Sequence, residues 1–222
     1  MIIGAGQQFP RNNSHCKLLC HFEADASDSS VGHSETHTPT VNGSPSYGAG
    51  KFGNCIDFGS SDTSKYVTFP DSTDWDFIAG ELGTISIWVY FNTINQYNPI
   101  ISRNNADGTR AVTYIEYRSQ DSPIRFFINC FGQAMYADIE LSASQWYHLG
   151  VSNNGSQAYF SVNGTIINSM NTAAKSVSSD KTLNIGVNRL LGFQSFAKFD
   201  EFAWIKGECL WTRNFDPPNR AS

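Results

Sequence analysis

The sequence predicts an all-β fold in which two antiparallel sheets pack face to face. No stretch of about eleven residues repeats its apolar side chains with the spacing of a helix. Runs in which apolar and polar side chains alternate recur about every dozen residues, which is typical of antiparallel sandwiches. Asn-Gly and Asp-Gly pairs, which favour tight hairpin turns, separate several of these runs.

The clearest strand is expected over residues 84–92. Apolar side chains at every second position share one face there, while Trp88 and Tyr90 share the other. A strand with both faces partly covered belongs inside a sandwich. Other runs predict strands, in chain order, at residues 17–23, 55–58, 66–69, 98–103, 111–118, 124–131, 134–139, 146–152, 158–163, 165–170, 182–187 and 196–206.

Turn signals place the hairpins and argue against a second domain. Asn163-Gly164 predicts a type I′ turn between two alternating runs, because that turn needs positive φ at both central residues. Pro217-Pro218 cannot join a ladder, so the chain leaves the sheet there. No Pro/Gly/Ser-rich linker divides the chain. We therefore predict one domain over residues 16–222, preceded by a polar N-terminal arm at residues 1–15 that docks on the domain or on a partner chain.

Composition and charge exclude several classes of protein. The 222 residues are 40% hydrophobic and 14% aromatic, which excludes intrinsic disorder. A net charge of −5 without a basic cluster argues against nucleic acid and membrane surfaces as partners. The apolar runs are far shorter than the ~20 residues that span a bilayer. Residues 1–12 lack the features of a secretory signal, so we expect folding in a cytoplasm, with the five cysteines unpaired and buried.

Several segments, taken in order, resemble a known family. They are Leu18-Leu-Cys-His-Phe22, Gly50-Lys-Phe-Gly-Asn-Cys-Ile-Asp-Phe-Gly59, Gly83-Thr-Ile-Ser-Ile-Trp-Val-Tyr90 and Gln145-Trp-Tyr-His-Leu-Gly-Val-Ser152 with Tyr159-Phe-Ser-Val-Asn-Gly-Thr165. Together they are similar to the concanavalin A-like, laminin-G-like jelly-roll family over residues 17–218. The ending, residues 199–218, resembles a subgroup often encoded by bacterial viruses. The resemblance implies a jelly-roll sandwich of two large, curved antiparallel sheets, with few or no helices.

The aromatic residues within the strands are expected to pack rather than to bind. Trp88, Trp146 and Trp204 lie within alternating runs, where large aromatic side chains dominate sandwich cores. His148 also lies inside a predicted strand. We expect it to be hydrogen-bonded in or beside the core.

The sequence lacks the acid pattern of the glycoside hydrolases that share this fold. Those enzymes carry Glu-x-Asp-x-x-Glu on one face of a strand, because hydrolysis needs two carboxylates across one cleft. Asp138 and Glu140 form the nearest pair, without a third acid. Asp200 and Glu201 are consecutive and are expected to point to opposite faces. We therefore predict that the protein is not an enzyme.

The resemblance implies one calcium site. Many members of the family hold a calcium ion with an N-terminal acidic loop and an Asp near the last strand, which here are Asp25, Asp28 and Asp200. Calcium takes about six to eight oxygen ligands. The alternative is that Asp25 and Asp28 make Asx turns while Asp200 faces solvent or accepts backbone amides. No cofactor is required by either reading.

Lectins on this fold bind sugars with polar loop residues and an aromatic ring. Loop 103–110 offers Asn104, Asp107 and Arg110, with Tyr97 shortly before it and Trp75 in another loop. We predict these five as ligand-binding residues. The alternative is that such residues serve turn geometry alone, since hairpin tips are rich in Asn, Asp and Gly.

These inferences predict a recognition protein without catalysis. We expect a bacteriophage virion protein, either a decoration or a fibre-like appendage subunit, that is assembled in the host cytoplasm and located on the virion. It would bind other virion proteins through residues 1–15, form a homo-oligomer and present its jelly roll to a host-surface glycan. The alternative is a stand-alone carbohydrate-binding module, and a glycoside hydrolase ranks third.

Overall fold

The computed structural model describes residues 14–60, 64–94, 96–105, 107–172, 177–179 and 181–219. The predicted N-terminal arm lies outside these residues, apart from Ser14 and His15. In chain order the elements are β1 (Cys16–Cys20), β2 (Thr40–Asn42), β3 (Ser46–Ala49), β4 (Asn54–Asp57), β5 (Tyr66–Phe69), the 3-10 turn η1 (Thr73–Trp75), β6 (Leu82–Phe91), β7 (Tyr97–Asn104), β8 (Ala111–Arg118), β9 (Arg125–Cys130), β10 (Gln133–Asp138), β11 (Trp146–Asn154), β12 (Gln157–Val162), β13 (Thr165–Asn171), β14 (Leu183–Ile185) and β15 (Ala197–Lys206).

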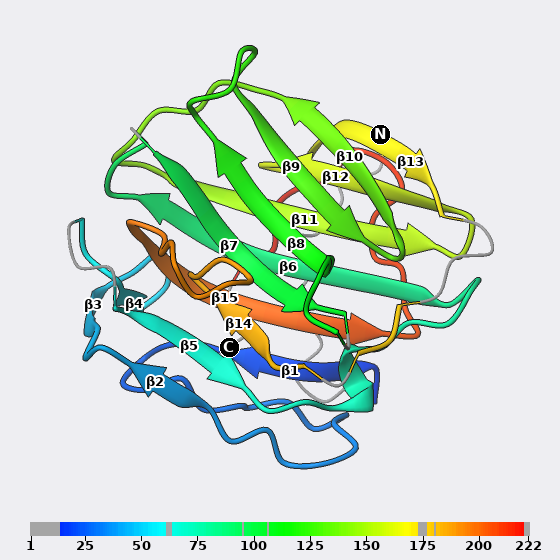
Figure 1. Cartoon of the computed structure of the whole chain (residues 1–222), viewed down its shortest axis with the longest axis horizontal. Helices are drawn as coiled ribbons and strands as arrows, with labels where there is room; N and C mark the ends of the chain where they lie inside the picture. The colour runs from blue at the N-terminus through cyan, green and yellow to red at the C-terminus, as the bar shows by residue number, and fades with distance from the viewer. Residues whose placement is uncertain are drawn as a thin grey trace.

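Two antiparallel sheets pack face to face, as the sequence predicts. The eight-stranded sheet has the order β13-β12-β11-β6-β15-β4-β3, with β1 paired to β15. The seven-stranded sheet has the order β10-β9-β8-β7-β14-β5-β2. In Figure 1 strands β7 to β10 lie side by side and cross over β6 and β11 of the other sheet. Among the described residues, no helix is long and apolar enough to cross a membrane.

Each predicted strand is present, and three short elements were missed. β2 and β3 lie in the Ser/Thr/His-rich segment 25–47, where their side chains are exposed or half-buried. A strand without a buried face shows no alternation, so the pattern gives no signal. The third missed element is η1, which begins after Ser72, whose side chain accepts the Asp74 amide.

Aromatic side chains join the two sheets through the core. Phe126 of β9 packs on Phe160 of β12 with ring centroids 5.0 Å apart, and Phe91 of β6 packs on Tyr117 of β8 at 5.3 Å. Trp204 is fully buried, which confirms it as a packing residue. Pairs of this kind stabilise a fold beyond their buried area.

The five cysteines are unpaired, as predicted. Four are buried and Cys209 is half-buried. Burial raises the pKa of the Cys130 thiol to about 12, so this group stays protonated and behaves as a small apolar side chain.

The turn between β12 and β13 has the predicted conformation. Asn163 and Gly164 have φ of 48° and 78°, as a type I′ turn requires. The Gly164 carbonyl accepts the Phe215 amide, and a Cβ on Gly164 would stand 1.9 Å from the Phe215 carbonyl oxygen. Glycine is therefore needed both for the turn and for the close approach of the chain end.

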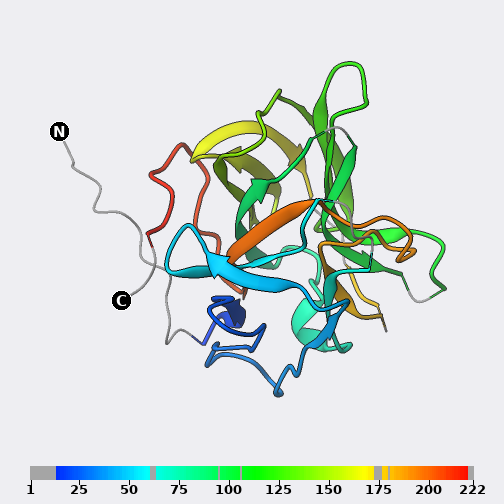
Figure 2. The same ribbon diagram turned by 90° about the vertical axis from the view of Figure 1, so that its left-hand side faces the viewer.

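The C-terminal segment, residues 208–219, covers the outer face of the eight-stranded sheet. Trp211 and Phe215 stack at 4.2 Å and both meet the ring of His148 edge-on. Figure 2 shows this segment, in red, on the side of the sandwich opposite to the green strands β8 and β9. His148 is fully buried and hydrogen-bonds Ser86, with 2.8 Å between Nε2 and Oγ, which confirms its expected place.

Candidate functional site

The outer face of the seven-stranded sheet carries a row of aromatic side chains. Alternation turns Phe126 and Ile128 of β9 into the core and Phe127 outward. Tyr114 of β8 lies 6.0 Å from Phe127, and Tyr136 of β10 lies 5.2 Å from it on the other side. We call Tyr114, Phe127 and Tyr136 the aromatic row. It crosses three adjacent strands, so the sheet backbone fixes its spacing.

Two arginines lie over the row. The Arg118 guanidinium stands 4.5 Å from the centre of the Phe127 ring, and that of Arg125 stands 4.6 Å from the centre of Tyr136. Asp121 pairs with Arg125 at 3.0 Å and accepts the Tyr97 hydroxyl at 3.0 Å. Cation–π contacts and these hydrogen bonds hold the polar groups of the face in fixed positions.

A buried carboxylate lies within this face, between Tyr114 and Arg118 of β8. Glu116 accepts the Tyr114 hydroxyl at 2.7 Å and Arg118 Nε at 2.8 Å. Burial and the nearby Glu116 carboxylate raise the pKa of the Tyr114 phenol, so this hydroxyl stays a donor. Both oxygens of Glu116 are thereby occupied, and its negative charge is balanced by Arg118.

A pocket of about 370 Å³ opens at one end of the aromatic row. This volume lies within the range of small-ligand sites, roughly 300–1,000 Å³. The β7–β8 loop, the β14–β15 loop and the two central strands form its walls, with the lining residues Thr109, Arg110, Ala111, Tyr114, Arg118, Phe127, Asn129, Asn188, Arg189 and Leu190.

The two loops that form the pocket are fixed by side-chain to backbone hydrogen bonds. Asn188 Oδ1 accepts the backbone amides of Leu190, Gly192 and Phe193. Asn104 Nδ2 donates to the Arg189 carbonyl at 2.9 Å, and Arg189 Nη1 donates to the Gly108 carbonyl at 3.0 Å. These bonds tie the two loops to each other, so the pocket is formed before a ligand arrives.

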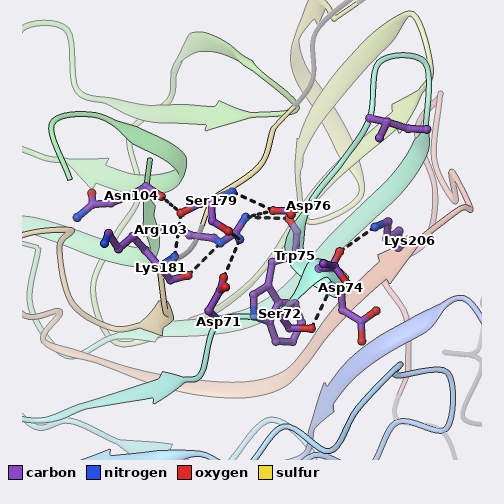
Figure 3. A network of polar contacts seen from close by, with 12 residues as sticks. Asp71, Ser72, Asp74, Trp75, Asp76, Arg103, Asn104, Ser179, Lys181 and Lys206 are labelled. Carbon is purple, nitrogen blue, oxygen red and sulfur yellow. Dashed lines mark hydrogen bonds and ion pairs between the residues drawn. The ribbon is translucent and has the colours of Figure 1, made fainter. Parts of the chain in front are cut away.

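Arg103, at the base of the predicted sugar-binding loop, belongs to the interior. Figure 3 shows its guanidinium between Asp71, Asp76 and the chain around Ser179 and Lys181. Its five N–H groups donate to two carboxylates, Asp76 at 2.8 Å and Asp71 at 3.2 Å, and to the carbonyls of Trp75, Ser179 and Lys181. This network fastens η1 and the segment before β14 to strand β7.

Four of the five predicted ligand-binding residues lie on or beside this face. Arg110 lines the pocket, and Tyr97 is 40% exposed beside Arg118. Asn104 holds the β14–β15 loop. Asp107 is exposed, and its Oδ1 accepts the amide and the hydroxyl of Thr109, at 2.9 and 2.6 Å. These two residues therefore shape the loops.

The prediction for Trp75 is wrong. The side chain is fully buried, its Nε1 donates to the Pro70 carbonyl, and its ring lies 4.4 Å from His37 and 5.8 Å from Trp204. The 3-10 turn η1 directs the indole into the core, so no ligand can stack on it.

The three predicted calcium ligands are not gathered into one cluster. Asp25 makes an Asx turn with Ser27, Asp28 Oδ1 accepts the amides of Leu19 and Ser30, and Asp200 Oδ2 accepts those of Lys51 and Phe52. Within the described part of the chain, no three His, Cys, Asp or Glu residues stand close enough to hold a metal ion. These carboxylates therefore follow the alternative given above, in which they accept hydrogen bonds from backbone amides. Asp25, Asp28 and Asp200 do not form a donor set that fits calcium.

Sequence reasoning missed the aromatic row and Arg189. The signal that could have found the row is the alternation in strands 111–118 and 124–131, where the positions facing away from the core hold Tyr, Phe and Arg. A cluster of aromatic side chains on a face turned away from the core marks a candidate interaction surface. No local pattern marks Arg189, which comes from a different loop.

Comparisons with known proteins agree with this architecture. Residues 61–208 match the family model described as the concanavalin A-like lectin/glucanases superfamily. No curated protein matches the sequence significantly. Among solved structures, domain 4 of AbnA, a GH43 extracellular arabinanase from Geobacillus stearothermophilus solved with arabinotriose, superposes with a TM-score of 0.66 at 17% identity, covering 88% of this chain and 94% of that one.

Toxin binding domains are also similar in fold. The botulinum neurotoxin serotype G binding domain gives a TM-score of 0.67 at 14% identity, over 88% of this chain and 48% of that one. The serotype D ligand binding domain, solved with N-acetylneuraminic acid, gives 0.65 at 13% identity, over 89% and 48%. The chain thus spans about half the length of these toxin domains.

Proposed function

The chain belongs to the concanavalin A-like lectin/glucanase superfamily, and from this premise we propose that it is a carbohydrate-binding module. Its sugar lies on the aromatic row and in the adjoining pocket. The observation that carries the proposal is the row of Tyr114, Phe127 and Tyr136, which leads from the exposed ring of Tyr136 to buried Tyr114 at a preformed pocket.

The chemistry of this face suits a sugar. A sugar ring presents an apolar face of C–H groups and a rim of hydroxyls. Phe127 and the exposed Tyr136 supply apolar surface, while Asn129, Asn188 and the arginines supply hydrogen-bonding groups around it. Ligand sites commonly combine an apolar lining with a few fixed polar groups of this kind.

We propose binding without catalysis. Glycoside hydrolysis needs two carboxylates about 5 to 9.5 Å apart, one of them able to give up a proton. No carboxylate lines the pocket, and the buried acid beside two of its lining residues, Glu116, is engaged by Tyr114 and Arg118. This arrangement supports a role for Glu116 in holding Tyr114 and Arg118 in place, rather than in transferring a proton.

The proposal is tested by screening the purified protein on a glycan array and measuring the hits by calorimetry. We expect at least one oligosaccharide to bind and Phe127→Ala to weaken it about tenfold, because the stacking surface is lost. Trp146→Ala is the matched control, since Trp146 is a half-buried aromatic residue on the other sheet. Absence of binding across the array, or equal loss in both variants, would contradict the proposal.

The setting of the module is a separate part of the proposal. A place on a bacteriophage particle, with residues 1–15 bound to other virion proteins and the module in a homo-oligomer, rests on the sequence resemblance. A stand-alone module is the alternative, and the similarity to arabinanase domain 4, solved with arabinotriose, supports sugar binding in either setting. Light scattering of the full chain and of a version without residues 1–15 distinguishes the virion setting from the stand-alone module. An oligomer that becomes a monomer on truncation supports the virion setting, and two monomers support the stand-alone module.

A further inference from the structure

The pocket beside the aromatic row is cationic in a protein that is acidic overall. The chain holds 15 Lys and Arg against 20 Asp and Glu, yet Arg110, Arg118 and Arg189 all line this one pocket, whose lining includes no acid. The three arginines come from two loops and a strand end. The fold therefore concentrates positive charge where the sequence shows no basic run.

Arg110 contributes an unengaged guanidinium. The residue is exposed, and its backbone amide donates to Asn105 Oδ1 at 2.7 Å, which fixes the base of the side chain. Among the described residues its guanidinium makes no hydrogen bond or ion pair. The nearest acid in sequence is Asp107, whose pKa is lowered by hydrogen bonds from Thr109 and, to a smaller extent, by the Arg110 charge.

Arg189 faces the pocket from the opposite loop. Its Nη1 donates to the Gly108 carbonyl, a neutral acceptor, so its charge is not cancelled within the described residues. Its positive charge acts on the Tyr114 phenol, as does that of Arg118, which places both cations around the end of the aromatic row. The bond to Gly108 also holds the guanidinium in place, and a fixed donor loses less entropy when it binds a ligand.

Arg118 differs from the other two because Glu116 balances its charge. Its Nε makes the bond to Glu116, and its guanidinium, which also lies over the Phe127 ring, lines the pocket. Asp121, the other acid of this face, is occupied by Arg125 and Tyr97. Arg189 donates to a neutral carbonyl and Arg110 has the exposed Asp107 carboxylate near it, so three arginines against Glu116 and Asp107 leave this end of the face with a net positive charge.

Resting on the proposed function, we infer that this pocket selects glycans that carry a carboxylated sugar, such as a uronic or a sialic-type acid. The guanidinium group matches the planar carboxylate with two parallel hydrogen bonds. The sugar ring lies against Tyr114 and Phe127, while its carboxylate is held between Arg110 and Arg189. A neutral sugar would leave these two cations without an anionic partner.

The experiment compares pairs of ligands that differ only in charge. The probes are N-acetylneuraminic acid and a glucuronic-acid disaccharide, each beside its neutral methyl ester, with a sulfated disaccharide as a further arm. We expect the acid to bind about tenfold more tightly than its ester, because a charge-assisted hydrogen bond is lost in the ester. Raising the salt concentration should weaken binding of the acid and leave the ester unchanged.

Arginine variants then identify which side chains bind the carboxylate of the sugar. Arg110→Ala and Arg189→Ala should each lower the affinity for the acid several-fold more than the affinity for the ester. Arg189→Ala should weaken binding of both, because it also breaks the bond to the Gly108 carbonyl that joins the two loops. Arg110→Lys keeps the charge but lacks the planar fork, so it should recover only part of the preference. Arg213→Ala is the matched control, since it removes an exposed arginine from the C-terminal segment on the opposite side of the sandwich.

The outcomes separate this inference from the proposed function. Equal affinity for acid and ester would overturn the inference and leave carbohydrate binding intact. Tighter binding of the sulfated sugar would overturn the assignment to carboxylates. Binding of no sugar at all, in the probes or on the array, would overturn the proposed function itself. If both arginine variants still prefer the acid over its ester, the acidic sugar binds elsewhere and the assignment to this pocket is wrong.

Discussion

The outer faces of the two sheets differ sharply, although the same alternation of side chains builds both. On the eight-stranded sheet the chain covers its own surface. Trp211 and Phe215 lie over His148, and the turn between β3 and β4 lies over Trp88, with Phe52 at 5.8 Å from its ring. On the seven-stranded sheet, Tyr136 remains 46% exposed and the pocket stays open.

Side chains on the covered face therefore serve stability, whereas those on the open face are available for binding. Polar groups on the covered face lose contact with water, so their protonation is tied to folding. His148 and Asp200 are both fully buried there. Polar groups on the open face are held by ion pairs at the surface, which contribute little to stability but fix geometry. The predictions below test this contrast.

The largest effect is expected at His148. Burial lowers its pKa from 6.5 to about 3, so the folded protein keeps it neutral while the unfolded chain takes up a proton below pH 6.5. The free energy of unfolding therefore has its full value above pH 6.5 as far as His148 is concerned. It falls by about 5 kcal/mol as the pH decreases from 6.5 to 3. Urea unfolding of the native protein and of His148→Gln between pH 3.5 and 7 measures it. A stability difference that does not change with pH would contradict the prediction.

Asp200 should show the opposite dependence. Burial raises the pKa of its carboxyl from 3.8 to about 7, so the folded state favours the protonated form. The free energy of unfolding therefore falls as the pH rises from about 4 to 7, by about 4 kcal/mol from this group. Asp200→Asn should remove that decline, whereas Asp138→Asn, at an exposed position of β10, should preserve it. Identical pH profiles for the two variants would show that Asp200 is not buried in this way.

Loss of the Trp211 side chain, which lies in the C-terminal segment over the eight-stranded sheet, should lower the free energy of unfolding by about 3 kcal/mol. Trp211→Ala deletes a buried ring that contacts His148, Phe215 and the backbone of Gly150, where a Cβ would stand 3.0 Å from the indole. Limited proteolysis should also cleave the C-terminal segment sooner in the variant. Unchanged unfolding midpoints and cleavage rates would mean that the segment does not stabilise the sheet.

The smallest change in stability is expected on the open face. Phe127→Ala removes a half-buried ring, so we expect a loss of about 1 kcal/mol or less, together with the loss of sugar affinity proposed above. Denaturant unfolding beside the calorimetry separates the two effects. A loss as large as that of Trp211→Ala would show that the aromatic row supports the fold.

The strands and hairpins could be predicted because their signals are local. β5 and β8 have the predicted bounds, since their alternation and turn residues lie within a few positions of one another. The short strands β2 and β3 could not, because neither buries a face. Loop 103–110 was recognised as a candidate site, and Arg110 does line the pocket. Trp75 could not be excluded, because a loop position does not tell which way an indole turns.

The all-β class, the positions of the strands along the chain and the residues that alternate between core and surface follow from the sequence, because a period of two is set by the backbone of each strand. Which outer face stays open depends on tertiary contacts. Burial of Arg103, packing of the chain end on His148 and the placement of Arg110 and Arg189 around one pocket all involve residues distant in sequence. Such contacts depend on how the sheets pack, so no local pattern encodes them.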